Sequence, residues 1–413
     1  MSAWFIKGGE YIKSGKARIG FVATNSITQG EQVAQLWPIL FNRCGLELAF
    51  AHRTFAWGSD VRGKAHVHVV IIGLDRGDNA RTKARLFSYT DLDRDPEESA
   101  HSSLSPYLID ASNLVDRHLT VEEENVPLNH MRQLSFGTQP LENGNLTFNS
   151  KERELFVRRE PLSAPYFRPF IGAKELLRNQ KRWILHTEDI APVQLQKMPL
   201  VRERLKAVKT FRGNSSRQTT KKLADFPTRY GVTEVPTEPF LTIPRVSSER
   251  REYVPIGWLK PPAIPSEATL ILRGATLREF GILTSAMHMA WLRQIGGRLE
   301  SRYRYSLGLV YNTFPIPPGF ASGQGDFSSI EELAQEVLDA RAVHTDATLT
   351  DLYDPIVMPT NLRKAHHALD RAVDRLYRSK RFDSERERLE YLFKLYEEML
   401  RPLGKNSKTK PRK

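Results

Sequence analysis

The stretch His66-Val67-His68-Val69-Val70-Ile71-Ile72-Gly73 is the most strand-like part of the sequence, because Val and Ile crowd into it. Two shorter apolar runs, residues 17–24 and 46–51, also predict strands. The residues from Thr28 to Arg43 predict a helix with a kink or a break at Pro38. Strands that alternate with helices predict a sheet covered by helices. About three strands fit into this part of the chain, which is too few for a complete doubly wound domain.

The remaining residues predict two further regions. Residues 151–320 are rich in proline and arginine, with short strand-like runs, and predict an irregular α+β domain. One long helix is expected inside it, from Phe280 to Leu299. Beyond a glycine-rich linker at 319–325, three amphipathic stretches predict a small helical bundle or hairpin: Ser329 to Val343, Asn361 to Tyr377 and Ser384 to Leu400.

The predicted fold class is therefore α/β plus α+β. A length of 413 residues predicts two or three domains. They are a partial Rossmann-like sheet within residues 1–150, the irregular domain at 151–320 and a helical domain at 321–403, followed by a basic tail at 404–413.

The positive charge is concentrated in the middle of the chain. The sequence carries 61 Lys and Arg against 48 Asp and Glu, a net charge of +13. Residues 151–310 hold 29 basic against 15 acidic residues, whereas residues 1–150 (15 against 17) and 311–413 (17 against 16) are close to neutral. A basic segment flanked by neutral ones is typical of proteins that bind a polyanion, since Lys and Arg displace phosphate counterions. A basic surface that only aids solubility is the alternative.

Several classes of protein are excluded by what the sequence lacks. No run of about 18 apolar residues predicts a transmembrane span, and no secretory signal pattern is present, so a cytoplasmic protein without a membrane partner is expected. The single cysteine, Cys44, is expected to be a small buried residue, and no Cys/His cluster has zinc spacing. No glycine-rich nucleotide motif and no Gly-x-Ser-x-Gly elbow occurs.

Six basic residues of the central region are candidates for contacts with a phosphate backbone. Residues 211–222 in particular predict a flexible loop that binds phosphates. For each residue the alternative is a solvated surface charge. The candidates are Arg182, Arg212, Arg217, Lys221, Lys222 and Arg229.

Several strings resemble one known family. They include Phe21-Val22-Ala23-Thr24-Asn25-Ser26-Ile27-Thr28-Gln29-Gly30-Glu31-Gln32, Ala51 to Trp57 and the strand from Val67 to Gly73, then residues 168–173, 281–291, 302–306, 309–315 and 351–355. Over almost its whole length the chain resembles adenine-specific DNA methyltransferases of the MmeI-like group, in which one polypeptide combines nuclease, methyltransferase and target recognition. The family's cofactor-binding glycine motif and its Asn-Pro-Pro-aromatic motif are absent, so the resemblance covers only the carboxy-terminal portion of such an enzyme.

The resemblance implies a function and a set of partners. The family transfers a methyl group from S-adenosylmethionine to the exocyclic amino group of adenine in double-stranded DNA. Residues 1–150 would then be the second half of a methyltransferase domain with a connector, and residues 151–320 a target recognition domain. An upstream catalytic chain would supply the missing motifs. The alternatives are a non-catalytic DNA-binding specificity module and an inert remnant.

Four residues are expected to contact bases. The target adenine must leave the duplex, and by family analogy Phe55 is the best match for an aromatic that stacks on it, with Trp57 competing and a core position as the alternative. Glu300, Arg302 and Arg304 are expected to read bases, since Glu accepts from the cytosine amino group and Arg binds guanine bidentately. In an extended segment Glu300 and Arg302 would point to the same side. A surface salt bridge of Glu300 with Arg302 or with Arg304 is the alternative, and no metal site is expected.

Overall fold

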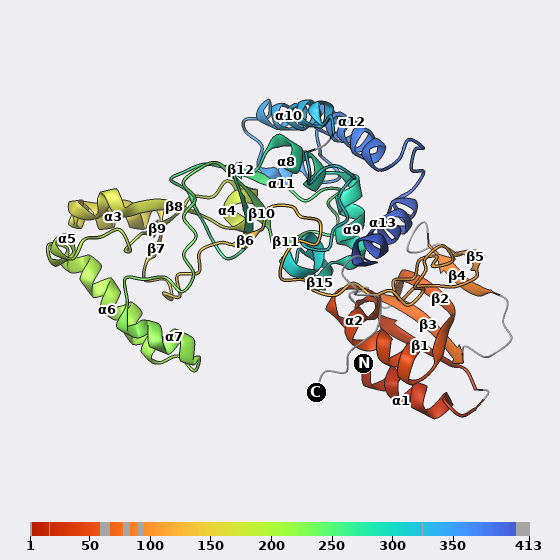
Figure 1. The fold of residues 1–413 in the computed structure, drawn as a ribbon. Coiled ribbons are helices and arrows are strands. Elements are labelled where there is room, and N and C mark those ends of the chain that lie inside the picture. The colour runs from red at the N-terminus through yellow and green to blue at the C-terminus, as the bar shows by residue number, and fades with distance from the viewer. Residues whose placement is uncertain are drawn as a thin grey trace. The chain divides into compact units, whose positions relative to one another are not determined.

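The computed structural model describes residues 2–15, 17–57, 67–76, 83–89, 95–323 and 325–401 (Figure 1). His66 and the basic tail at 404–413 lie outside these ranges. The chain folds into two compact units, each built from segments that are far apart in sequence. Unit 1 comprises Met1–Met131, Ala286–Asp326 and Asp370–Lys413, and unit 2 comprises Arg132–Ser285 and Phe327–Leu369. Within the described ranges, no helix has the length and apolar character needed to cross a membrane.

Unit 1 contains the sheet predicted at the start of the chain. Its strands are β1 (Ile19–Thr24), β2 (Leu46–Trp57), β3 (Val67–Arg76), β4 (Ala84–Ser88) and β5 (Glu97–His101), in the order β1-β3-β2-β4-β5. The three predicted strands are confirmed, although β2 runs on well beyond its predicted end. In this sheet the β2–β4 pairing is parallel, and the β1–β3, β2–β3 and β4–β5 pairings are antiparallel. A mixed α/β fold is confirmed, whereas the partial Rossmann-like description stays a prediction.

Helices α1 (Ser2–Ile12) and α2 (Glu31–Pro38) accompany this sheet. Phe5 of α1 packs on Phe21 of β1 with ring centroids 4.6 Å apart. The helix predicted from Thr28 to Arg43 is shorter as an α-helix, since Asn25–Thr28 is a 3-10 turn (η1) and Pro38 is followed by a π-helical turn, η2 (Ile39–Arg43). The predicted break at Pro38 is confirmed, as is the burial of Cys44.

The helix predicted from Phe280 to Leu299 is wrong as a single element. The structure has α8 (Leu277–Leu283) in unit 2, then α9 (Ala286–Ile295) and a hairpin of β15 (Gly297–Leu299) and β16 (Arg302–Arg304) in unit 1. The hydroxyls of Thr284 and Ser285 donate to the carbonyls of Phe280 and Ile282, at 2.8 and 2.7 Å. Such local hydrogen bonds compete with continuation of the helix. A π-helical turn, η5 (Leu307–Tyr311), follows the hairpin.

Unit 2 has two small sheets, as the predicted irregular α+β domain requires. One contains β6 (Ser135–Phe136), β10 (Phe240–Pro244), β12 (Gly257–Leu259) and β14 (Thr269–Arg273), and the other β7 (Thr147–Asn149), β8 (Phe167–Ile171), β9 (Arg182–Leu185) and β13 (Ile264–Pro265). The second sheet shares a buried apolar core with α3 (Ser150–Arg159) and α6 (Pro199–Gly213). The shorter elements of the unit are η3 (Pro161–Tyr166), α4 (Ala173–Arg178), α5 (Pro192–Gln196), α7 (Gln218–Lys222), η4 (Leu223–Asp225), β11 (Val246–Ser247) and α11 (Leu349–Leu352).

The three helices predicted near the end of the chain are confirmed as α10 (Ser328–Ala342), α12 (Thr360–Tyr377) and α13 (Glu385–Leu400). They do not form a compact unit of their own, since α10 lies in unit 2, α13 in unit 1 and α12 is divided between the two. Within unit 1, α12 and α13 do contact each other, with Arg388 Nη2 2.6 Å from Asp374 Oδ2, as the hairpin alternative predicts. In unit 2, α10 packs against α8, where a Cβ atom on Gly281 would come within 2.8 Å of Ile330. In unit 1, α13 packs against α9, with Trp291 and Phe393 ring centroids 5.4 Å apart. Helices α10 and α13 thus each pack on an earlier helix. The domain boundaries stay predictions.

Candidate nucleic-acid interface

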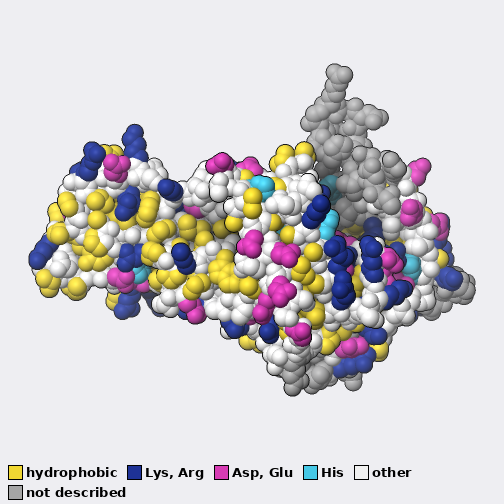
Figure 2. Space-filling view, turned by 90° about the horizontal axis from the view of Figure 1, so that it is seen from above, with side chains coloured by type: hydrophobic (Ala, Val, Ile, Leu, Met, Phe, Trp, Pro, Cys, Tyr) yellow, Lys and Arg dark blue, Asp and Glu magenta, His cyan; other side chains and the backbone are white. Residues whose placement is uncertain are grey.

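Helices α6 and α7 of unit 2 present a basic surface, at the lower left of Figure 1. Residues 199–229 hold nine Lys and Arg against two Asp and Glu. Helix α6 buries Val201, Leu205 and Val208, whereas the side chains of Arg202, Lys206 and Lys209 are exposed. We call the exposed basic residues of this segment the basic surface: Arg202, Lys206, Lys209, Arg217, Lys221, Lys222 and Arg229. On the face drawn in Figure 2, by contrast, Asp and Glu side chains stand among the Lys and Arg.

Arg212 is not part of this surface, and its prediction as a phosphate contact is wrong. Its side chain is fully buried, and its guanidinium donates to five backbone carbonyls. The expected flexible loop at 211–222 is also wrong, because α6 continues to Gly213 and α7 follows at Gln218. The spacing 201, 205, 208, 212 puts Arg212 on the buried stripe of α6, and this periodicity is the signal that would have placed it correctly.

Arg182 is held within unit 2. Its Nη2 lies 3.0 Å from Glu175 Oε2, and its guanidinium lies 4.5 Å from the centroid of the Phe170 ring. The side chain is about one-third exposed. Its prediction as a backbone contact stays a prediction, and the structure does not bring it into the segment that carries the basic surface.

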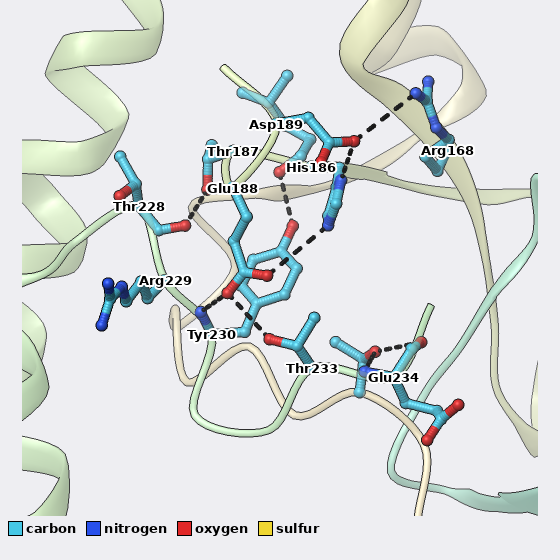
Figure 3. Close-up of polar contacts among 12 residues, drawn as sticks. Arg168, His186, Thr187, Glu188, Asp189, Thr228, Arg229, Tyr230, Thr233 and Glu234 are labelled. Carbon is cyan, nitrogen blue, oxygen red and sulfur yellow. Dashed lines mark hydrogen bonds and ion pairs between the residues drawn. The ribbon is translucent and has the colours of Figure 1, made fainter. Parts of the chain in front are cut away.

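A second set of contacts fixes the chain around Arg229 (Figure 3). Thr187 Oγ1 donates to the carbonyl of Thr228 at 2.7 Å. Glu188 Oε1 accepts from the Tyr230 amide at 2.8 Å and from Thr233 Oγ1 at 2.9 Å. The Arg229 side chain points away from Glu188 and Tyr230. Sequence reasoning missed Thr187 and Glu188, since nothing in a polar turn after a strand shows which distant segment it holds.

The hairpin β15–β16 carries the predicted base-reading residues in unit 1. Glu300 lies in the turn with a φ of 59°, so the prediction of an extended segment from Glu300 to Arg302 is wrong. The two side chains nevertheless meet, with Arg302 Nη2 2.7 Å from Glu300 Oε2. Both are exposed. Arg304 is also exposed and lies 3.9 Å from Glu31 of α2.

Phe55 lies on β2 within a group of aromatic rings. It is half-buried and stacks on Tyr89, with ring centroids 5.0 Å apart. His52 Nδ1 lies 2.9 Å from the Tyr89 hydroxyl, and the His52 ring stacks on Phe87. Burial, together with the charge of Arg85, lowers the pKa of His52. The side chain of the competing candidate, Trp57, lies outside the described part of the structure.

Three family models match consecutive segments of the chain. They are the MmeI DNA-methyltransferase domain at residues 1–88, the MmeI target recognition domain at 115–318 and the MmeI C-terminal domain at 324–403. The chain belongs to the MmeI family.

A curated relative and a solved structure agree with this assignment to the MmeI family. DNA methyltransferase A of Bacillus subtilis (strain 168) is 38% identical over 399 residues, which are 97% of this chain and 44% of that protein. The structure of the type IIL restriction-modification enzyme MmeI in complex with DNA is 38% identical, with a TM-score of 0.84, and the match covers 97% of this chain and 52% of that one. The chain thus spans about half the length of the relatives it matches.

The site residues fall into two of the MmeI segments. The basic surface and the hairpin with Glu300 both lie within the residues that match the MmeI target recognition domain, whereas Phe55 lies within the match to the methyltransferase domain. Among the residues that the structure describes, no group of three His, Cys, Asp or Glu side chains is arranged to hold a metal ion.

Proposed function

We propose that this chain provides DNA target recognition to an adenine-specific methyltransferase of a restriction-modification system and contributes half of its methyltransferase domain. The observation that carries the proposal is the basic surface on α6 and α7, within the segment that matches the MmeI target recognition domain. The proposed partner is double-stranded DNA, and the proposed location of the protein is the cytoplasm, where it would meet this substrate.

The basic surface would contact the phosphate backbone. Its seven exposed cations lie on two consecutive helices and the turn that follows them, so several of them can reach one stretch of duplex. If about six phosphates are neutralised, the logarithm of the binding constant should fall with the logarithm of salt concentration with a slope of roughly −5. Among the candidates that remain after Arg212, Arg182 is the least suited, because its guanidinium is already paired with Glu175.

The hairpin would read a C·G base pair. Arg302 would donate to guanine O6 and N7 while Glu300 accepts from the amino group of the paired cytosine, and each good contact contributes about 1–3 kcal/mol of discrimination. The ion pair between the two exposed side chains stabilises the free protein by about 0–1 kcal/mol, which is less than the base contacts would gain. Arg304, on the same strand, would contact a neighbouring base or phosphate.

The methyltransferase half would act through residues near Phe55. S-adenosylmethionine would supply the methyl group. The strand β1 leads into the turn Asn25–Thr28 rather than into a glycine-rich turn, so the residues present do not form the family's cofactor site, and we assign none of them to it. Phe55 would stack on the adenine after it leaves the duplex, opposite the aromatic of an Asn-Pro-Pro motif supplied by an upstream catalytic chain.

A second candidate is a non-catalytic specificity module. It is favoured by the basic surface, whose exposed cations can bind duplex DNA without any methyltransferase chemistry. The test is to incubate the full chain with labelled S-adenosylmethionine and duplex DNA of mixed sequence, with and without the missing half of the methyltransferase domain from a relative. We expect DNA binding with no methyl transfer by the chain alone, and transfer when the missing half is added. Methylation by the isolated chain would contradict the need for a catalytic partner, and DNA binding without transfer in either case would favour the specificity module.

A further inference from the structure

The guanidinium of Arg212 uses all five of its N–H donors inside unit 2. Nε donates to the carbonyl of Leu141 at 2.9 Å, and Nη2 donates to those of Pro140 and Arg229 at 2.8 and 2.7 Å. Nη1 donates to the carbonyls of Leu223 and Phe226, at 3.2 and 3.0 Å. A guanidinium offers five N–H donors in a rigid, planar arrangement. Lysine has three donors on a flexible stem and cannot reproduce the arrangement.

The acceptors of Arg212 are not random neighbours. Three of them belong to the segment Leu223–Arg229, which follows directly after Lys221 and Lys222 of α7. The other two, the carbonyls of Pro140 and Leu141, belong to the segment that precedes β7 and lie about 70 residues before Arg212 in the sequence. Arg212 therefore joins the end of α6 to the start and the end of the turn that carries Arg229.

A second anchor completes the support of this turn. Glu188 holds the amide of Tyr230, one residue beyond Arg229, and Thr187 holds the carbonyl of Thr228, one residue before it (Figure 3). The backbone of Arg229 is thus fixed on both sides while its side chain remains exposed. A buried cation on the apolar stripe of a helix is costly, and its desolvation lowers the pKa of Arg212. This cost of burying the guanidinium is explained if the turn has to be rigid before DNA binds.

We propose that Arg212 is a positioning residue of the DNA interface, which holds Lys221, Lys222 and Arg229 at a fixed spacing that matches the phosphates. The inference rests on the proposed function, because it assumes that the basic surface contacts DNA. It goes beyond that function by assigning a role to a residue that cannot touch DNA. Pre-organised contacts bind more tightly because their ordering entropy is spent on folding rather than on binding.

The first test uses the full chain and a fluorescent duplex of mixed sequence, with anisotropy measured over a range of KCl concentrations. Arg212→Lys keeps the net charge but loses the planar guanidinium with its five N–H donors. The triple variant Lys221→Ala, Lys222→Ala, Arg229→Ala removes the supported cations, and we expect it to lower the steepness of the salt dependence by about 2.7, since each lost phosphate contact lowers it by about 0.9. We expect Arg212→Lys to lower the steepness of the salt dependence by a large part of the decrease expected for the triple variant. Adding Arg212→Lys to the triple variant should change binding no further.

The controls separate positioning from general destabilisation. Arg371→Lys, an exposed arginine on α12, should bind DNA like the parent chain. Thermal unfolding of each variant reports whether it is folded. A parent-like salt dependence in Arg212→Lys would overturn the proposal, and so would a further loss when it is added to the triple variant. A triple variant that binds like the parent chain would instead refute the basic surface as the DNA site, and the proposed role of Arg212 with it.

A second measurement needs no variant, in case Arg212→Lys does not fold. Hydrogen exchange of the amides at residues 217–230 is compared in the parent chain with and without duplex DNA. A pre-organised turn should exchange slowly in the free protein and gain little protection when DNA binds. Fast exchange in the free chain, with protection only in the complex, would show that DNA rather than Arg212 orders the turn and would overturn the proposal.

Discussion

The carboxylate of Glu300 and the guanidinium of Arg302 lie 2.7 Å apart across the turn that joins β15 to β16. The Glu300 side chain is 77% exposed and that of Arg302 is 44% exposed, so water and salt screen the attraction between them. A pair of this kind adds little to folding. Its donors and acceptors are already side by side, as reading the two bases of one pair requires.

Loss of this ion pair should leave the stability of the protein almost unchanged. We expect Glu300→Gln to change the free energy of unfolding by less than about 1 kcal/mol, because both side chains are exposed. Urea unfolding measures it. The matched control is Asp374→Asn, which breaks the largely buried pair of Arg388 with Asp374 and should cost about 3 kcal/mol. Equal losses in the two variants would show that the Glu300 pair is a structural element of the hairpin.

Burial of His288 should make unit 1 less stable in acid. The side chain is enclosed beside the Tyr305 hydroxyl, 2.8 Å from Nε2, and burial lowers the pKa of His288 to about 3. The unfolded chain binds a proton near pH 6.5 while the folded chain does not, so stability is full above pH 6.5 and is lost as the pH falls from there towards 3.

Between pH 6.5 and 5, the expected loss from His288 is about 2 kcal/mol, at about 1.4 kcal/mol per pH unit. His288→Gln should lack this contribution, and urea unfolding of both proteins at several pH values compares them. The buried His366 of unit 2, whose pKa is also lowered by burial, adds a similar slope that is common to the parent and the variant. Identical pH dependence in the two proteins would contradict the account.

The packing of α8 on α10 depends on the missing side chain of Gly281. A Cβ atom at this position would come within 2.8 Å of Ile330 Cγ2. We expect Gly281→Val to destabilise the protein by about 2 kcal/mol, as overpacking of a core usually does. Ile330→Ala is also expected to be destabilising, but the double variant should lose less than the sum of the two, because the smaller residue makes room for the larger one. Simple addition of the two losses in urea unfolding would contradict this packing.

Local pattern was sufficient to predict the strands and the last helices. The run from Val67 to Gly73 forms the first seven residues of β3, and α10, α12 and α13 begin and end within a residue or so of their predicted bounds. In these segments the apolar period alone decides the structure. Resemblance to known sequences then predicted the family, which the comparisons confirm.

Positions decided by distant contacts could not be predicted in the same way. For Arg212 the apolar period of α6 indicates burial, but its five acceptors become apparent only when the carbonyls of residues 140–141 and 223–229 are placed around it. Likewise, Gly296 and Gly297 gave no sign that the chain would turn back into a hairpin and set Glu300 in a left-handed conformation. Burial and long-range hydrogen bonds, rather than local propensity, determine both sites.

Target recognition by the hairpin can be measured directly by selecting duplexes from a random pool with the full chain and sequencing those that bind. The account predicts that the parent chain selects a motif with a C·G pair at one position. It predicts that the double variant Glu300→Lys, Arg302→Asp selects G·C at that position and leaves the others unchanged, because the donor and the acceptor have exchanged places. Selection of the same motif by both proteins, with only a uniform change in affinity, would contradict base reading by Glu300 and Arg302.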